Sequence, residues 1–137
     1  MPPHTPCRLE LHIECLDDLP PVCFGIDVER TRDLFYCWGG STEELGAPLR
    51  AFRRGEVIRI VYDFVAHFAR GHYRMNVNVR DSVGGRFWFF AESVVGFTVH
   101  EEQSYDGVAH IAPVVRISSS SDTDNTSPAD LVANLRA

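Results

Sequence analysis

Apolar and polar residues alternate along most of this chain, which is the pattern of β-strands that bury one face and expose the other. The clearest case is 72–81, where Tyr73, Met75, Val77 and Val79 alternate with polar residues. No stretch has a helical period of useful length, so the sequence predicts an all-β protein, an antiparallel β-sandwich of about eight strands. The predicted strands are 8–16, 22–30, 34–38, 56–65, 72–81, 86–90, 94–100 and 108–117.

Turn-forming residues separate these strands and mark the end of the domain. Gly84 and Gly85 form a typical hairpin signal, and 39–55 reads as a long loop. From residue 118 onward the sequence is rich in Ser, Asp, Asn and Thr, a composition that buries little apolar surface. We therefore expect one β-sandwich domain over 1–117, followed by a flexible tail over 118–137.

Composition narrows the function classes. The 137 residues carry a formal net charge of −6 and contain no basic stretch, which disfavours nucleic acids and anionic membranes as partners. No apolar run approaches the roughly 18 residues of a membrane span, and the first residues do not resemble a signal peptide. All 13 basic residues are Arg, so neither a P-loop lysine nor a Schiff-base lysine is present.

No motif of an enzyme or a metal centre stands out. The sequence has neither a G-x-S-x-G nucleophile elbow nor an H-E-x-x-H pair, and no cysteine pair has C-x-x-C spacing. Scattered histidines of this kind are more often surface or loop residues than ligands. The sequence therefore predicts a non-enzyme with no metal and no cofactor. The histidines are His4, His12, His67, His72, His100 and His110, and the cysteines are Cys7, Cys15, Cys23 and Cys37.

The polar face of the predicted strand 72–81 is the most informative surface. Its side chains offer planar, directional hydrogen-bond donors and acceptors that suit the vicinal hydroxyls of a sugar. Aromatic rings nearby would supply flat apolar faces for the sugar ring. In the alternative interpretation, this face is merely soluble and the tryptophans belong to the core. The candidate carbohydrate-binding residues are Asp27, Tyr36, Trp38, Arg74, Asn76, Asn78, Arg80 and Trp88.

Several short motifs occur in an order that resembles a known family. The stretch Val-Cys-Phe-Gly-Ile-Asp-Val over 22–28 resembles the V-F-G-I-x-I strand of Wzt-type C-terminal domains. The segment 71–81, with Gly-His-Tyr followed by Val-Asn-Val-Arg-Asp, resembles that family's G-x-Y…V-x-x-D segment. Shorter similarities lie at 39–42, 55–57, 97–99 and 107–111, and the resemblance covers roughly 9–117.

This resemblance implies a fold, a role and partners. Such domains are immunoglobulin-like sandwiches that form the carbohydrate-binding part of the ATP-binding subunit of O-antigen polysaccharide ABC exporters. The implied function is recognition of a bacterial polysaccharide in the cytoplasm, at the inner face of the membrane. The implied partners are the transporter's nucleotide-binding domain and membrane subunit. The implied homodimer exchanges the last strand, 108–117, across a hinge at 101–107.

An alternative function stays open from the residues alone. The chain could be a dimerisation or partner-docking sandwich with no glycan ligand, since the apolar segment 108–117 is suited to pairing with another sheet. A small hydrolase has no motif in its favour.

Overall fold

The protein forms two antiparallel sheets in a computed structural model, which describes residues 1–81, 85–103, 105–120 and 133–136. The smaller sheet pairs β1 with β5, and the larger sheet has the order β3-β2-β6-β7 with β4 attached to one end of β2. The described residues contain no helix, and the predicted all-β antiparallel sandwich is confirmed. The strands are β1 (Thr5–Glu14), β2 (Leu19–Arg30), β3 (Phe35–Ser41), β4 (Arg50–Phe52), β5 (Val57–Ala66), β6 (Gly71–Arg80) and β7 (Phe87–Val99).

The core lies between the two sheets and follows the alternation in the sequence. All four apolar residues predicted to face inward from β6 are buried. Tyr73, Met75 and Val77 belong to one cluster with Ile26 and Val28 of β2, and Val79 belongs to a second cluster with other β2 residues. Leu9 of β1 covers the first cluster from the smaller sheet. Burying an aliphatic side chain of this size stabilises a fold by about 1.5–3 kcal/mol, so this shared inner face accounts for much of the stability.

One long strand replaces two predicted ones. The segments 86–90 and 94–100 belong to a single strand, β7, which pairs with β6 along its whole length. The register shifts where Met75 faces Val95 but Val77 faces Ala91, which leaves extra residues on β7 as a bulge. The polar residues between the two predicted strands lie in this bulge. The short strand β4 lies inside the predicted loop 39–55.

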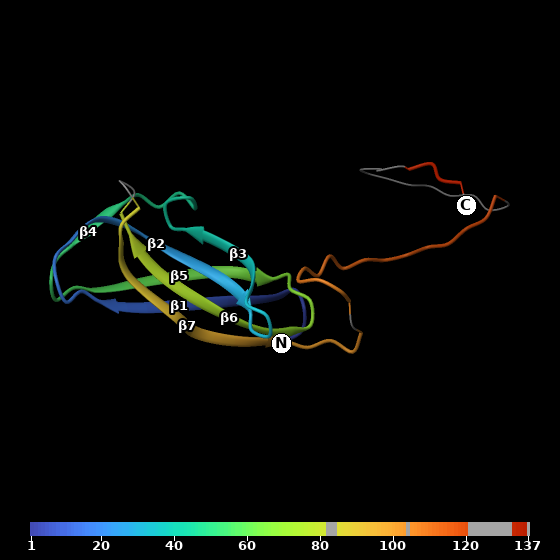
Figure 1. The fold of residues 1–137 in the computed structure, drawn as a ribbon, viewed down its shortest axis with the longest axis horizontal. Helices are drawn as coiled ribbons and strands as arrows, with labels where there is room; N and C mark the ends of the chain where they lie inside the picture. The colour runs from blue at the N-terminus through green and yellow to red at the C-terminus, as the bar shows by residue number, and fades with distance from the viewer. Residues whose placement is uncertain (82–84, 104, 121–132, 137) are drawn as a thin grey trace.

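The predicted strand 108–117 does not form within the single chain. Ala109 makes an isolated bridge with Phe68, and the backbone then turns at Ala112, which has a φ of +50°. The next residues leave the sandwich, as the orange segment of Figure 1 shows. Ile111, Val114, Val115 and Ile117 are 81–95% exposed. The apolar pattern is real, but no strand of the described residues lies beside the segment in one copy of the chain.

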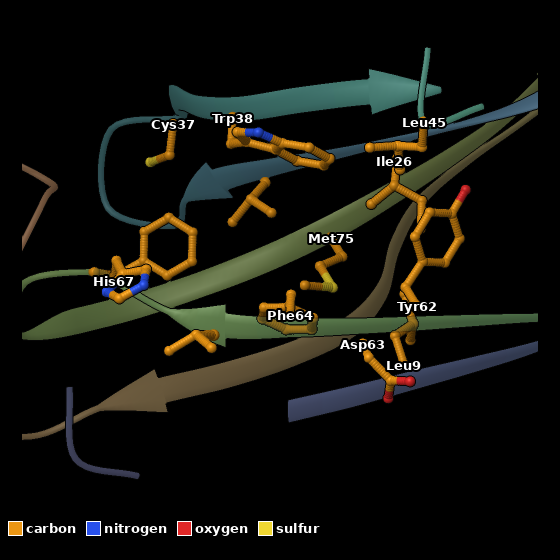
Figure 2. Close-up of a pocket in the computed structure, with 13 residues that line it drawn as sticks. Leu9, Ile26, Cys37, Trp38, Leu45, Tyr62, Asp63, Phe64, His67 and Met75 are labelled. Atoms are coloured by element: carbon orange, nitrogen blue, oxygen red, sulfur yellow. The ribbon is translucent and has the colours of Figure 1, made fainter. Parts of the chain in front are cut away.

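The two sheets differ in width, and this difference leaves openings on both sides of the core. The narrow β1–β5 sheet cannot cover the whole inner face of the larger sheet. An apolar cavity of about 390 Å³ opens beside β3 and β5, and Figure 2 shows Trp38, Phe64 and Met75 around it. A second cavity of about 590 Å³ lies between β1 and β7.

Candidate functional site

The outer face of the larger sheet carries a polar hollow of about 240 Å³. The register of β2 with β6 places Gly25 opposite Asn78 and Asp27 opposite Asn76, so their side chains share this face. The hollow brings together four of the eight predicted site residues: Asp27, Tyr36, Asn78 and Arg80. The remainder of its lining is Gly25, Ile26, Gly39, Gly40 and Glu44.

Two glycines form the floor of the hollow. A Cβ atom on Gly25 would lie 2.5 Å from Asn78 Oδ1, and a Cβ on Gly39 would overlap the hydroxyl oxygen of Tyr36. The missing side chains therefore leave room for the Asn78 amide and for the hydroxyl end of the Tyr36 ring against the backbone. Gly39 was expected to begin a loop, but it belongs to β3, and its role as the seat for an aromatic ring was not predicted.

Asn78 and Arg80 supply the hydrogen-bonding groups of the hollow. Asn78 Oδ1 is buried and has no hydrogen-bond partner among the described groups. The Arg80 guanidinium lies 3.6 Å from the Glu44 carboxylate, across the rim of the hollow. Burial raises the pKa of the Tyr36 phenol, with the carboxylates of Asp27 and Glu44 adding to the effect, so this hydroxyl stays a donor at neutral pH.

Arg74 and Asn76 share the outer face, but other residues of the sheet already bind them. Arg74 forms an ion pair with Glu29 at 2.8 Å. Asn76, which is 2% exposed, donates to Asp27 Oδ1 at 2.6 Å and accepts from the Ser93 amide at 2.9 Å. These bonds hold β2 and the β7 bulge against β6, so both side chains are committed to the sheet.

Asp27 sits between the hollow and this hydrogen-bonded row. Burial raises the pKa of its carboxyl group, and the hydrogen bond from Asn76 partly opposes that effect. Asn76 thus lowers the pKa of Asp27 against the effect of burial and positions the acceptor that Asp27 presents to the hollow.

The structure places the two tryptophans away from the hollow. Trp38 pairs with Val28 and lines the apolar cavity beside β3 and β5 on the inner side of the sheet. Trp88 lines the other cavity, with the Arg86 guanidinium 4.0 Å from the centre of its ring. The two rings thus lie at opposite edges of the core, and neither joins the polar site.

Aromatic residues outside the predicted site flank the polar row instead. Phe90 pairs with Asn78 and Phe87 pairs with Arg80, so both rings share the outer face. They are 52% and 58% exposed, which is unusual for phenylalanine. Tyr36 lies three strands away, so the face has an aromatic side chain at each border, and from the spacing of strands the two borders are about 14 Å apart. The run of aromatics at 87–90 was the available signal.

The described residues supply no arrangement typical of metal chemistry. Among them, no group of three or more His, Cys, Asp or Glu side chains is placed to hold a metal ion. The four cysteines are free thiols, and two of them, Cys15 and Cys23, are buried. Within the described part of the chain there is also no helix long and apolar enough to cross a membrane.

Comparisons with known proteins agree with the fold and with the family resemblance of the sequence. The solved structure "Crystal structure of the C-terminal domain of wzt" is similar at a TM-score of 0.72 and 12% sequence identity, covering 85% of this chain and 72% of that one. At this identity the likeness concerns the fold alone. No curated protein matches the chain. The sequence profile described as the Wzt C-terminal domain matches residues 2–111, most of the chain, and on that evidence the chain belongs to the Wzt C-terminal domain family.

Proposed function

We propose that this domain recognises a bacterial O-antigen-type polysaccharide, without catalysis, for export by an ABC transporter. The observation that carries the proposal is the polar hollow on the outer sheet face of a chain belonging to the Wzt C-terminal domain family. We infer from the same family that its partners are the transporter's nucleotide-binding domain and membrane subunit. The domain would then work in the cytoplasm, at the inner face of the membrane.

The hollow suits a sugar because its groups are preorganised and polar. Asn78 offers an amide with an unpaired carbonyl oxygen, Arg80 offers directional N–H donors, and Asp27 offers an acceptor. Tyr36 reaches Gly39 with its hydroxyl end, and its exposed ring is an aromatic surface of the kind that packs against the C–H face of a sugar. The exposed Phe90 repeats that surface on the other side of the row, which favours a polymer lying across the strands over a single small sugar.

Glycan binding by the purified chain tests this proposal directly. We expect selective binding on an array of bacterial O-polysaccharides, and an affinity at least about tenfold lower for Asn78→Ala, which removes one hydrogen-bonding group. Trp38→Phe is the matched control, because that residue lies on the opposite face of the sheet. No binding across a broad array, or an equal loss in both variants, would contradict the proposed site.

A second function, dimerisation, is supported by the exposed apolar segment after Ala109. The bridge between Phe68 and Ala109 starts an antiparallel register beside the free edge of β5. The β5 edge of a second copy offers the same register, in which Ile111, Pro113, Val115 and Ile117 would face Ala66, Phe64, Tyr62 and Ile60. These β5 residues share one face of the strand, and Tyr62 and Phe64 line the 390 Å³ cavity. We propose that residues 111–117 add to β5 of a second copy and close this cavity.

This arrangement narrows the exchanged segment predicted from the sequence. Residues 108–110 are already hydrogen-bonded to their own chain, through Ala69 N–H to Val108 O and His110 N–H to His67 O. The piece free to pair elsewhere is therefore 111–117, and the hinge lies near Ala112, where φ is positive.

Two neighbouring valines separate dimerisation by this strand from other modes. In the extrapolated register Val115 faces the cavity, whereas Val114 faces outward beside Asp63. We expect Val115→Lys to be a monomer in analytical ultracentrifugation, while Val114→Lys remains a dimer because its charge lies in solvent next to a carboxylate. A monomeric wild-type chain, or a dimer that tolerates both lysines, would contradict the exchange. Glycan binding by the monomeric variant shows whether the two functions are independent.

A further inference from the structure

Three histidines that are far apart in the sequence meet at one end of the sandwich. His4 lies before β1, His67 follows β5, and His110 lies in the segment after β7. His4 Nδ1 is 2.6 Å from His67 Nδ1, and His4 Nε2 is 2.6 Å from His110 Nδ1. His110 Nε2 is in turn 3.0 Å from Glu101 Oε1. We call these four side chains the histidine clasp, because they connect the segment 101–110 to the N-terminal segment and to the end of β5.

One backbone N–H determines the direction of every hydrogen bond in the clasp. The Ala112 amide can only donate, and it lies 3.3 Å from His110 Nδ1, so this nitrogen is an acceptor. His4 Nε2 must then donate to it, and His110 carries its own proton on Nε2, from which it donates to Glu101. In a neutral His4 ring the other nitrogen accepts, so His67 Nδ1 donates. Three neutral rings thus satisfy every bond in one direction, ending at a carboxylate.

Among the described residues, few other bonds hold the segment 101–110. Arg30 Nη1 donates to Gly107 O at 3.2 Å, and two backbone hydrogen bonds tie Val108 and His110 to the 67–69 turn. Most of the segment is exposed and forms no regular strand. A segment with so few contacts opens at a low free-energy cost, so the side chains of the clasp are a large share of what retains it.

Protonation weakens the clasp at His110. A proton on His110 Nδ1 faces the Ala112 N–H, which can only donate, so that contact is lost, and His4 must give up its Nε2 proton before it can accept from His110. The charged rings also repel one another. The facing groups on the packed segments are His67, Glu101 and the Tyr105 ring, which packs edge-on against His110 at 5.7 Å. Further along, the Met1 amino group lies 3.1 Å from His100 Nδ1.

The direction of the pH effect follows from His4. Burial lowers the pKa of His4, the His67 and His110 rings lower it further, and Glu101 opposes them. A lowered pKa means that the folded chain favours the neutral ring. The stabilisation is therefore complete above the ordinary histidine pKa of about 6.5 and is lost as the pH falls below it.

We propose that the histidine clasp is a proton-operated latch, which holds the segment 101–110 against its own sandwich while the rings are neutral and releases it when they are protonated. Taken with the proposed dimer, release lengthens the free arm from 111–117 to 101–117, and this consequence alone rests on the proposed function. The latch itself is a property of one chain.

Hydrogen exchange of the full-length chain tests the latch. Protection factors, corrected for the intrinsic pH dependence of exchange, are compared at about pH 7.5 and about pH 5.5. We expect the peptide spanning 105–112 to lose about tenfold in protection at the lower pH, while peptides from β2 and β6 keep theirs. Equal protection of 105–112 at the two pH values would overturn the proposal.

Two variants and one additive distinguish proton control by the clasp from other causes of a pH response. His110→Phe keeps a planar ring but cannot accept, so we expect its 105–112 peptide to be unprotected at both pH values. His12→Gln removes a histidine outside the clasp and should retain the wild-type pH response. A response that disappears with EDTA would assign the effect to a bound metal and overturn proton control. Because exchange is read within one chain, a failed latch and a failed dimer are recognised separately, the second by ultracentrifugation.

Discussion

Two asparagines on β6 are expected to have different roles, Asn76 a structural one and Asn78 a ligand-binding one. Asn76 and Asn78 share the outer face of β6, but within the described part of the chain only Asn76 forms side-chain hydrogen bonds, to Asp27 and to the Ser93 amide. We predict that Asn76→Ala strongly destabilises the fold, whereas Asn78→Ala changes stability by less than about 1 kcal/mol, since its carbonyl oxygen is already unpaired.

The size of the Asn76→Ala effect follows from the two bonds that are lost. A hydrogen bond to a charged group contributes about 1.5–3 kcal/mol, and a buried N–H left without a partner costs about 1–3 kcal/mol. Allowing for water reaching the bulge, we expect a loss of roughly 3 kcal/mol in the free energy of unfolding. For a chain of this length the melting temperature should fall by about 10 °C.

Urea unfolding followed by circular dichroism measures both variants, and pH adds an internal check. Burial raises the pKa of Asp27, and its hydrogen bond from Asn76 opposes this, so the pKa rises further in Asn76→Ala. A raised carboxyl pKa favours the folded state at low pH and disfavours it as the carboxyl ionises. The deficit of the variant should therefore shrink between pH 7 and about pH 4. Equal stabilities for Asn76→Ala and Asn78→Ala at pH 7 would refute this reasoning.

Three further predictions concern tyrosines. Tyr73→Phe should cost about 1–2 kcal/mol in urea unfolding, because the buried hydroxyl donates to Ala69 O at 2.7 Å; an unchanged midpoint would mean that water satisfies this carbonyl. Gly39→Ala should displace the Tyr36 ring and lower glycan affinity to the level of Tyr36→Ala, so a binding isotherm like that of wild type would exclude the ring from the site. Burial raises the pKa of Tyr62 to about 12, so absorbance at alkaline pH should show its phenolate forming last. A raised tyrosine pKa favours the folded state below pH 10, and this contribution to stability disappears between pH 10 and 12. A Tyr62→Phe variant with the same titration curve would contradict the assignment.

The period-two pattern was enough to predict the fold class and the buried face of β6, because one residue of slippage would reverse every side chain. It was not enough for β7, where Ser93 adopts a φ of +54° and the bulge depends on Asn76, a residue on another strand. Segment 108–117 shows the same limit, since apolar alternation describes a strand's capacity to pair and says nothing of which chain supplies the neighbour.

The candidate site was predictable only as a face. Alternation placed Arg74, Asn76, Asn78 and Arg80 on one side of the sheet, but the hollow forms where Gly25 and Gly39 lack side chains, and that depends on the cross-strand register. The same register separates Asn76, which is used by the sheet, from Asn78, which is not. The histidine clasp lay beyond any local pattern, because its members come from three distant segments.

The pairing of strands also determines when the chain can fold during synthesis. β1 emerges first, yet its only partner in the described sheet is β5, with Thr5 opposite Ala66. β2 can form a hairpin with β3, but its other edge waits for β6, with Arg30 opposite Tyr73 and Cys23 opposite Arg80. The apolar face of the nascent chain therefore stays uncovered until more than half of the residues have left the ribosome, and such non-local sheets close slowly. Production of this domain is therefore expected to depend on chaperone supply and growth temperature more than on the stability of the finished fold.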